Sequence, residues 1–318
     1  MNKNIDFDIM RKPGFYNEVL ERRKHNIDSA KNSGGWKSIN ECPICGFNDN
    51  TEAQFTTVYS QYIYCKKCKC VYSNRIPTKQ NTGKFEMKDF QEIKNLSEEL
   101  IKKYRQDRFA EERIQIIKKY IKKDMNKCNL LDVGCSTGFF LEVAKKYFKN
   151  VSGMEKDKVT AEYAEKVLGI PIHTCDVSKI KESYDVITLF DVLEHIEKPL
   201  ELLHSLKSKL NDNGIILAFT PNYHSISFRM LESGSTHLYP GHVVLFSEGT
   251  VDFISNELYM QKIMFETQGM DWFDMLAYDR DINKIPIDNS IIKKHVNKLQ
   301  DITNALYDAN SLRFILRK

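Results

Sequence analysis

The sequence predicts an α/β protein built on a mainly parallel sheet, with a small cysteine-rich module ahead of it. From residue 126 onward, short apolar runs alternate with longer segments of helical periodicity. Strands that alternate with helices form βαβ units with right-handed crossovers, so their strands run parallel. Five of the eight cysteines lie between residues 42 and 77, which sets a second, smaller module apart from the sheet.

Composition and charge exclude several classes of protein. A chain of 318 residues has room for one full α/β domain and an appendage. Lysine and arginine exceed the acids by only 47 to 43, too small an excess to predict a nucleic-acid or anionic-membrane partner. No window of 18 uncharged apolar residues predicts a membrane span, and the N-terminus lacks the apolar stretch of a signal peptide. We therefore expect a cytoplasmic protein whose cysteines bind metal or are buried as thiols.

Four regions follow one another along the chain. They are a polar segment over 1–41, a zinc-binding module over 42–83, a linking helix over 84–125 and the α/β domain over 126–318. In the first region, the periodicity predicts a helix over 15–31 that ends at a glycine pair. In the α/β domain, the apolar runs predict strands over 130–133, 151–154, 171–175, 184–190 and 215–219. The intervening patterns predict helices over 139–148, 158–168 and 200–210.

Two C-x₂-C pairs in the second region have the spacing of a zinc site. Cys42 and Cys45 are separated by nineteen residues from Cys65 and Cys68. Each pair places two thiolates on one side of a metal, and the segment between them is long enough for a hairpin. With four protein ligands, the zinc would be structural; the alternative is a set of unpaired buried thiols. Cys70 is spare, and we expect it to pack as a small hydrophobic residue.

The first predicted strand runs through a tight turn into a helix, as LLDVGCSTGFF over residues 130–140. Small residues allow the backbone to approach a ligand, and the helix N-terminus presents free N–H groups. The pattern is neither G-x-G-x-x-G nor a phosphate loop. Taken alone, it is equally compatible with a compact turn that binds nothing.

The residues that follow strengthen the prediction of a ligand. Glu155 ends the second strand, where a carboxylate can accept two ribose hydroxyls, and Asp176 ends the third, where it could accept an adenine amino group. The run YDVITLFDVLEHI over 184–196 forms a fourth strand and a loop. A fifth strand opens at an Asn-Gly pair and ends at Pro221.

Together these motifs resemble the class I S-adenosylmethionine-dependent methyltransferases over about residues 125–318. LDVGCSTG is similar to their first motif, with Ser136 where many members carry glycine. YDVITLFDVLEHI resembles their fourth motif in the subgroup that includes small-molecule O-methyltransferases. The resemblance implies a Rossmann-like, seven-stranded, mainly parallel sheet behind a small N-terminal zinc-ribbon-like module. It also implies a helix over 247–257, a sixth strand over 259–265 and a seventh, antiparallel edge strand over 311–317.

The resemblance further implies the residues that bind S-adenosylmethionine. In the α/β domain they are Asp132, Gly134, Cys135, Ser136, Gly138, Glu155, Asp176, Val177 and Phe190. On the linking helix, Tyr104 and Arg108 would close over the cofactor, with the arginine pairing with its carboxylate. The alternative for these two residues is a solvated helix face.

The acceptor side depends on the loop after the fourth strand. His195 could act as general base for an acceptor hydroxyl. Alternatively, Asp191, Glu194 and His195 resemble the E-x-x-E-H metal site of ubiquinone-pathway and small-RNA O-methyltransferases, with His242 as a further ligand to Mg²⁺. A purely structural histidine is the third interpretation. Four residues of a later loop would contact the acceptor or lie on the surface: Tyr223, His224, His237 and Tyr239.

The predicted function is O-methylation of a small polar acceptor. A zinc knuckle ahead of this fold resembles sugar and polysaccharide-pathway methyltransferases, which implies a sugar or glycan precursor and a role in carbohydrate biosynthesis. The alternatives are N- or C-methylation of a similar acceptor, and a zinc-ribbon binding protein with a non-catalytic cofactor domain. Residues 271–310 would either contribute to the acceptor pocket or form a surface excursion.

Overall fold

The computed structural model describes residues 5–32, 35–49, 52–78, 106–287 and 291–318. Among these residues, no helix combines the length and the apolar character that a membrane span requires. A seven-stranded sheet forms the centre, in the order β12-β13-β10-β9-β6-β7-β8. Its strands are β6 (Asn129–Val133), β7 (Asn150–Met154), β8 (Ile172–His173), β9 (Tyr184–Phe190), β10 (Leu210–Pro221), β12 (Gln261–Gln268) and β13 (Ser311–Arg317).

The mainly parallel, seven-stranded sheet predicted from the sequence is confirmed. Strands β6 to β10 pair in parallel, whereas β13 runs antiparallel to both β10 and β12. The strand β9 is almost fully buried because helices cover both faces of the sheet, which explains its nearly continuous apolar run. Several predicted boundaries shift. Strand β8 has only two residues, and β10 begins five residues earlier than its apolar run. The helix predicted over 139–148 ends at Ala144, and the strand predicted over 259–265 is found over Gln261–Gln268.

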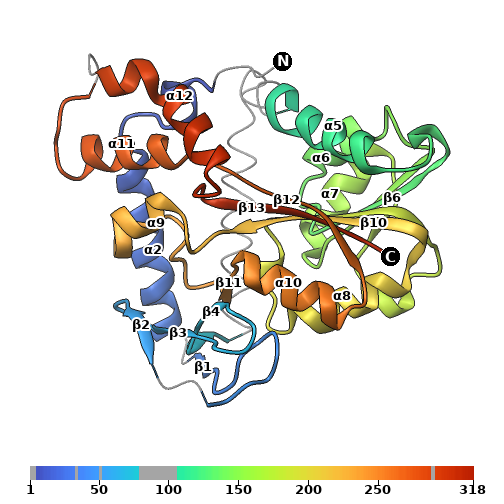
Figure 1. The fold of residues 1–318 in the computed structure, drawn as a ribbon, viewed down its shortest axis with the longest axis horizontal. Coiled ribbons are helices and arrows are strands. Elements are labelled where there is room, and N and C mark those ends of the chain that lie inside the picture. The colour runs from blue at the N-terminus through green and yellow to red at the C-terminus, as the bar shows by residue number, and fades with distance from the viewer. Residues whose placement is uncertain (1–4, 33–34, 50–51, 79–105, 288–290) are drawn as a thin grey trace.

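Helices cover both faces of the sheet (Figure 1). On one face lie η1 (Gln106–Ala110), α5 (Glu111–Tyr120), α6 (Phe139–Ala144) and α7 (Lys158–Leu168). On the other lie η3 (Val177–Lys179), η4 (Leu193–His195), α8 (Pro199–Ser208) and α10 (Glu248–Glu257). The ends of these helices follow local chemistry. Asp157 caps the start of α7 through the Thr160 N–H, Gly169 ends it in the left-handed conformation, and Ser247 opens α10 with a capping box.

The prediction that the last strand lies at the edge of the sheet is wrong. β13 lies between β10 and β12, and β12 forms the edge. The physical reason is in the burial pattern: the five central residues of β13 are buried, whereas most of β12 is only partly buried. A strand that is apolar on both faces gains more by lying inside the sheet, where both of its edges also find hydrogen-bond partners.

The cysteine-rich module is joined to the domain by a shared sheet and a shared core. Its strands are β1 (Trp36–Ser38), β2 (Ala53–Thr56), β3 (Gln61–Tyr64), β4 (Val71–Ser73) and β5 (Arg75–Pro77). The sheet β2-β3-β4 is completed by β11 (Val244–Leu245), which belongs to the α/β domain. Buried residues of the module such as Tyr72 belong to the same apolar cluster as Phe246 and Val251. The module therefore packs as part of the α/β domain and is not a separate folding unit.

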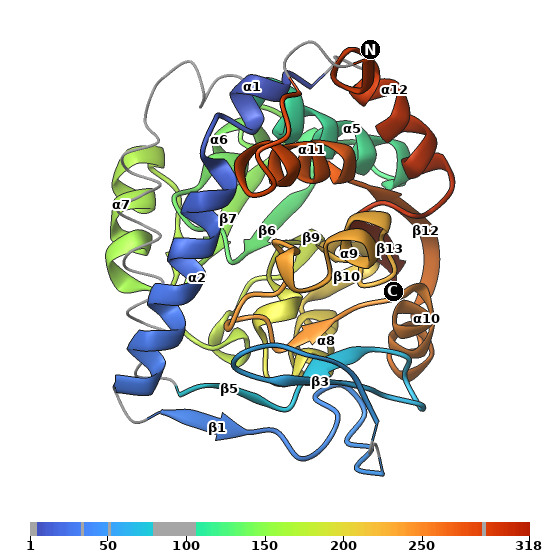
Figure 2. The ribbon, with the colours of Figure 1, turned by 90° about the vertical axis from the view of Figure 1, so that its left-hand side faces the viewer.

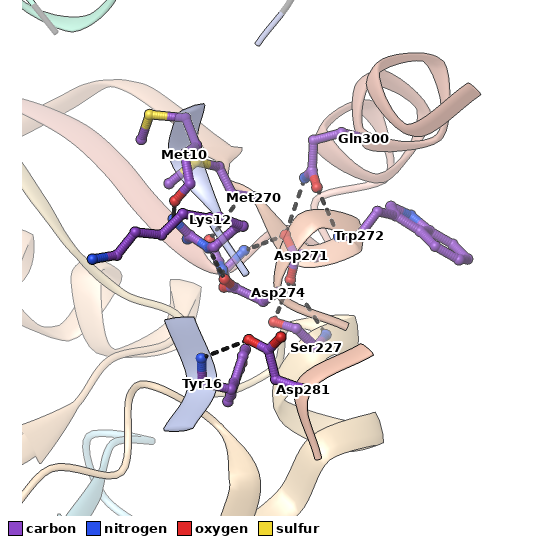
Figure 3. A network of polar contacts seen from close by, with 12 residues as sticks. Met10, Lys12, Tyr16, Ser227, Met270, Asp271, Trp272, Asp274, Asp281 and Gln300 are labelled. Atoms are coloured by element: carbon purple, nitrogen blue, oxygen red, sulfur yellow. Dashed lines mark hydrogen bonds and ion pairs between the residues drawn. The ribbon is translucent and has the colours of Figure 1, made fainter. Parts of the chain in front are cut away.

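The N-terminal segment packs over the carboxyl edge of the sheet (Figure 2). Its helices α1 (Phe7–Met10) and α2 (Phe15–Asn32) lie with α11 (Asp271–Asp281), α12 (Ile291–Ala305), and α9 (Ile226–Leu231) with its short extension η5 (Glu232–Gly234). We call this group of helices the cap. Buried carboxylates tie it together, as Figure 3 shows: Asp281 accepts from the Tyr16 N–H at 3.0 Å, and Asp271 accepts from Ser227 and Gln300. The helices α11 and α12, which lie within residues 271–310, therefore belong to the cap.

Candidate active site

The turn between β6 and α6 holds three residues in the left-handed conformation. Gly134, Ser136 and Gly138 have φ angles of 70°, 49° and 79°. A Cβ on Gly138 would lie 2.1 Å from Leu168 Cδ1, and one on Gly134 would lie 2.5 Å from Val192 Cγ2. The positive φ angles therefore favour glycine at both positions, and any larger residue would also displace these side chains. Ser136 takes a conformation that glycine adopts more readily, which explains why glycine stands there in many relatives of this motif.

The Glu155 carboxylate connects this turn to the next strand. Its Oε2 accepts from the Ser136 N–H at 3.0 Å, and its Oε1 accepts from the Asp157 N–H at 3.0 Å. Each oxygen keeps a further lone pair for a hydroxyl donor. Asp176 lies after β8, with an exposed side chain, and the Val177 side chain beside it is buried. The two carboxylates thus follow adjacent strands at one edge of the sheet, which suits a nucleoside.

Asp132 is a buried carboxylate behind the turn. It accepts from Thr188 Oγ1 at 2.6 Å. Burial raises the pKa of Asp132 to about 7, and the Thr188 hydrogen bond and the Arg113 charge offset part of that rise. The neighbouring Cys135 is also buried. A carboxylate near its pKa, paired with one hydroxyl, is well suited to a cationic partner.

Arg113 is a functional candidate that the sequence reasoning missed. Its guanidinium carbon lies 3.9 Å from the ring centroid of Phe190, at the end of β9. The signal for it was its place on the linking helix, five residues after Arg108. Arg108 belongs to the π-helix η1, but its side chain lies outside the described part of the structure, as does the whole of Tyr104. Among the residues that the structure describes, Arg113 is therefore an arginine of this helix that lies against the ends of the central strands.

Three potential metal ligands converge beyond β9. Glu194, His195 and His242 each offer an atom within 4.8 Å of the other two. His195 Nδ1 lies 3.0 Å from the Gly241 carbonyl oxygen, and His242 Nδ1 lies 2.8 Å from that of His237. Because a carbonyl oxygen only accepts, Nδ1 is the donor in both rings. Each neutral ring therefore keeps a lone pair on Nε2 for a proton or a metal ion.

Glu194, His195 and His242 contribute no positive charge at neutral pH. Burial, and then the charge of Asp191, raise the pKa of Glu194 well above its ordinary value. Its carboxylate accepts from Thr220 Oγ1 at 3.0 Å. Burial lowers the pKa of both His195 and His242, so both rings are neutral at neutral pH. His195 still reaches solvent. The group can take up a cation or, at His195, a proton.

A cavity of about 220 Å³ lies beside Asp191 and His237, and none of the three residues of this group lines it. Asp191 and His237 line it, together with residues of the cap, of α5 and of the strand ends. Asp191 is not part of the three-residue metal group, although its charge reaches Glu194. The other three predicted loop contacts do not line the cavity. Tyr223 stacks on His224 and packs toward the cysteine module, and the Tyr239 ring lies 5.6 Å from that of His242.

The cysteine quartet has the geometry of a tetrahedral metal site. Cys42 and Cys68 have their Sγ atoms 3.4 Å apart, and those of Cys45 and Cys65 are 3.5 Å apart. All four lie within 4.8 Å of one another, which fits thiolates about 2.3 Å from one zinc ion. The residues after each pair, Gly46 and Lys69, both take left-handed φ angles, so the two turns are alike.

The spare thiol of Cys70 is fully buried, as expected for a small hydrophobic residue. However, its Sγ also lies 3.5 Å from that of Cys42 and 3.6 Å from that of Cys68. The spare residue therefore contacts the quartet rather than packing only among carbon atoms.

The chain is similar to known methyltransferases. A family model described as a methyltransferase domain matches residues 101–285. The mitochondrial ubiquinone biosynthesis O-methyltransferase of Schizosaccharomyces pombe is 29% identical over 101 residues, which are 29% of this chain and 37% of that protein. Its counterpart in Actinobacillus pleuropneumoniae serotype 7 is 24% identical over 159 residues, which are 46% of this chain and 63% of that protein.

The chain thus spans between about a third and two-thirds of the length of these two relatives. Among solved structures, a SAM-dependent methyltransferase from Archaeoglobus fulgidus is similar at 18% identity and a TM-score of 0.45, over 68% of this chain and 98% of that one. The family match covers more than half of the 318 residues and includes the glycine turn, Glu155 and His195. Because this match covers more than half of the chain, the chain belongs to the methyltransferase-domain family, in the class I form that uses S-adenosylmethionine.

Proposed function

We propose that this protein methylates a hydroxyl group of a small polar acceptor, such as a sugar or a glycan precursor. The observation that carries the proposal is the group of Glu194, His195 and His242 beside a polar cavity at the carboxyl edge of the sheet. The names of the relatives, which are O-methyltransferases, support oxygen as the acceptor atom. The eight free cysteines are consistent with a cytoplasmic location.

S-adenosylmethionine supplies an electrophilic sulfonium methyl group when it is bound. The residues present fit it: Glu155 has lone pairs left for ribose hydroxyls, and the turn of Gly134, Ser136 and Gly138 gives close access to backbone. Asp176 would accept from the adenine amino group. We assign Asp132, Cys135, Val177 and Phe190 to the same pocket.

His195 would act as the general base. Its Nδ1–H is held by the Gly241 carbonyl, so Nε2 can accept the hydroxyl proton as the oxygen attacks. Its lowered pKa keeps the ring neutral at neutral pH, ready for that transfer. Attack in line with the leaving sulfur then needs only that the cavity hold the hydroxyl in place.

A divalent ion is the second candidate, favoured by the two Nδ1-anchored rings beside a buried carboxylate. Such rings are typical of metal ligands, whose second nitrogen is usually held by a carbonyl or a carboxylate. Glu194, His195 and His242 would hold the ion, and Asp191 would add negative charge. Bound there, it would acidify the acceptor hydroxyl. Two imidazoles and one carboxylate suit Mn²⁺ or Zn²⁺ better than Mg²⁺, which prefers oxygen ligands.

Variants of Asp191, Glu194 and His195 distinguish the two mechanisms. Transfer of labelled methyl from S-adenosylmethionine to hydroxylated acceptors is measured with His195→Ala, and with His204→Ala, an exposed histidine on α8, as control. A base predicts a loss of about 10²–10⁴-fold in kcat for His195→Ala alone, with unchanged S-adenosylhomocysteine affinity. A metal predicts that Asp191→Asn, Glu194→Gln and a chelator cause similar losses. Full activity of His195→Ala in the presence of chelator contradicts both.

A further inference from the structure

The cavity beside Asp191 is built by parts of the chain that are far apart in sequence. Arg11 comes from the N-terminal segment, Arg113 from α5 and Arg313 from β13, and all three line it. Asp191 and Asp274 line it too. Three guanidinium groups thus line one cavity together with two carboxylates.

Two of these arginines are buried inside the protein. Arg11 is 8% exposed and Arg313 is 6% exposed. Burying a guanidinium costs several kcal/mol unless its charge and its N–H groups find partners. Arg11 has one, since its Nε lies 2.6 Å from Asp274 Oδ1, and Asn310 donates to the other oxygen of that carboxylate. This pair is internally compensated.

The charge of Arg313 is paired, but one of its donors is not. Its Nη1 lies 3.2 Å from Glu112 Oε1 and 3.2 Å from Gln268 Oε1, its Nη2 lies 3.4 Å from Glu112 Oε2, and Glu266 is 3.6 Å away. Its Nε is buried without a hydrogen-bond partner among the described residues. Burying a donor without a partner is destabilising, and a ligand bearing an acceptor atom would offset that cost. His237 Nδ1, also on the lining, is buried without a partner in the same way.

Two of the three arginines lie together in the cavity. The guanidinium carbons of Arg113 and Arg313 are 5.4 Å and 4.5 Å from the ring centroid of Phe219. Asp191 and His237 also line the cavity, and they adjoin the group of Glu194, His195 and His242, since the His237 carbonyl accepts from His242. The lining therefore holds an arginine pair and the residues next to this group.

We propose that this cavity binds an acceptor bearing an anionic group, a carboxylate or a phosphate, at Arg313 with Arg113 beside it. The reacting hydroxyl then points toward Asp191 and His237. Guanidinium groups bind both anions through charge-assisted hydrogen bonds. The inference rests on the proposed methyl-transfer function, because it names the acceptor class of that same site.

The test measures binding of three sugars that share a ring: glucose, glucuronate and glucose 6-phosphate. Calorimetry is done on the full chain with S-adenosylhomocysteine present, and inorganic phosphate and acetate are titrated separately. We expect an anionic sugar to bind at least 10-fold more tightly than glucose. Arg313→Gln should weaken that binding roughly 10- to 100-fold. Arg317→Gln, on the same strand but outside the cavity, is the matched control and should leave it unchanged.

A second variant guards against misfolding, because Arg313→Gln also leaves Glu112 without its partner. Ser311→Asp adds a carboxylate to the lining and keeps the arginine network, and it should weaken anion binding to a similar extent. If only glucuronate and acetate bind, the anionic group of the acceptor is a carboxylate. If only glucose 6-phosphate and inorganic phosphate bind, the anionic group is a phosphate.

Three results would overturn the proposal: no anion binds, all three sugars bind equally, or Arg313→Gln weakens S-adenosylhomocysteine binding instead. The last result would mean that these arginines serve the cofactor carboxylate. Failure of the proposed function is a separate observation, namely bound anion without transfer of methyl to any hydroxyl.

Discussion

Glu155 holds the glycine turn and also faces the predicted ribose position. The N–H groups of Ser136 and Asp157 already bind its two oxygens. A truncation at this position therefore loosens the turn as well as removing ligand contacts. The conservative variant separates these effects, because glutamine keeps one acceptor oxygen and loses the charge.

We expect Glu155→Ala to weaken S-adenosylhomocysteine binding by about 2–4 kcal/mol. Glu155→Gln should lose roughly half as much, since one ribose hydroxyl keeps an acceptor. Calorimetry measures both, with Glu162→Ala, an exposed residue of α7, as control. Equal affinity of Glu155→Ala and the parent protein would remove the ribose assignment.

Asp132 gives a prediction about pH. Because its pKa is raised to about 7 in the folded protein and is near 4 when unfolded, folding favours its protonated form. Its contribution to stability is present below pH 4 and is lost as pH rises to 7. Asp132→Asn, which can still accept from Thr188, should therefore stabilise the ligand-free protein by about 1–3 kcal/mol at pH 8 and by less at pH 5.

Urea unfolding at pH 5, 6 and 8 measures this difference. The same variant should bind S-adenosylhomocysteine more weakly, because the negative charge is removed from the site. A stability difference that stays constant across these pH values would show that Asp132 titrates normally.

At the scale of elements, the cysteine module supports the loop that carries His242. Strand β4 pairs with β11, which begins two residues after His242, and the Val243 N–H donates to the Glu194 carbonyl. Ser247, which caps α10, also donates through Oγ to the Lys69 carbonyl in the second cysteine turn. The cysteine module and the loop that carries His242 are thus linked by strand pairing and by hydrogen bonds to main-chain carbonyls.

Removal of zinc should therefore affect more than the module. We expect Cys65→Ser, or a strong chelator, to lower the midpoint of thermal unfolding in a single transition, because the cysteines belong to the main apolar cluster. Amide exchange at Val244 and Leu245 should accelerate at the same time. Elemental analysis should find one zinc per chain in the parent and in Cys175→Ser, whose thiol lies outside the quartet. A parent protein that holds no zinc contradicts the prediction.

In the molecule as a whole, the N-terminal segment is part of the cap. Asp281 accepts from the N–H groups of Gly14 and Tyr16 and from Arg280, and Arg280 donates to two carbonyls of the same segment. These contacts join residues more than 260 positions apart. They hold the segment that brings Arg11 to the cavity.

Asp281→Asn should release this segment. Replacing the buried carboxylate leaves Arg280 without its ion pair, so we expect about 1–3 kcal/mol of lost stability and faster tryptic cleavage after Arg11 and Lys12. Asp279→Asn, on the same helix, is the control. Identical cleavage rates in the parent and in Asp281→Asn would show that other contacts hold the segment.

The parallel core and the cysteine quartet could be predicted from the amino-acid sequence, because each one depends on a pattern of residues close together in the chain. An apolar run such as 184–190, a glycine turn or a C-x₂-C pair acts within a few residues, and each one appears where it was predicted. The helix predicted over 15–31 was found over nearly the same residues for the same reason. The roles of Glu155, Asp176 and His195 stay predictions.

The contacts between elements that are far apart in the sequence could not be predicted and are seen in the folded structure alone. The order of β12 and β13, the pairing of Arg11 with Asp274 and the approach of His242 to Glu194 depend on residues 48 to 263 positions apart or on whole strands. Arg313 left a partial signal, a charge within an otherwise apolar strand, yet its partners come from α5 and β12. No local pattern specifies such contacts, because they form when separate elements bury their apolar faces against one another.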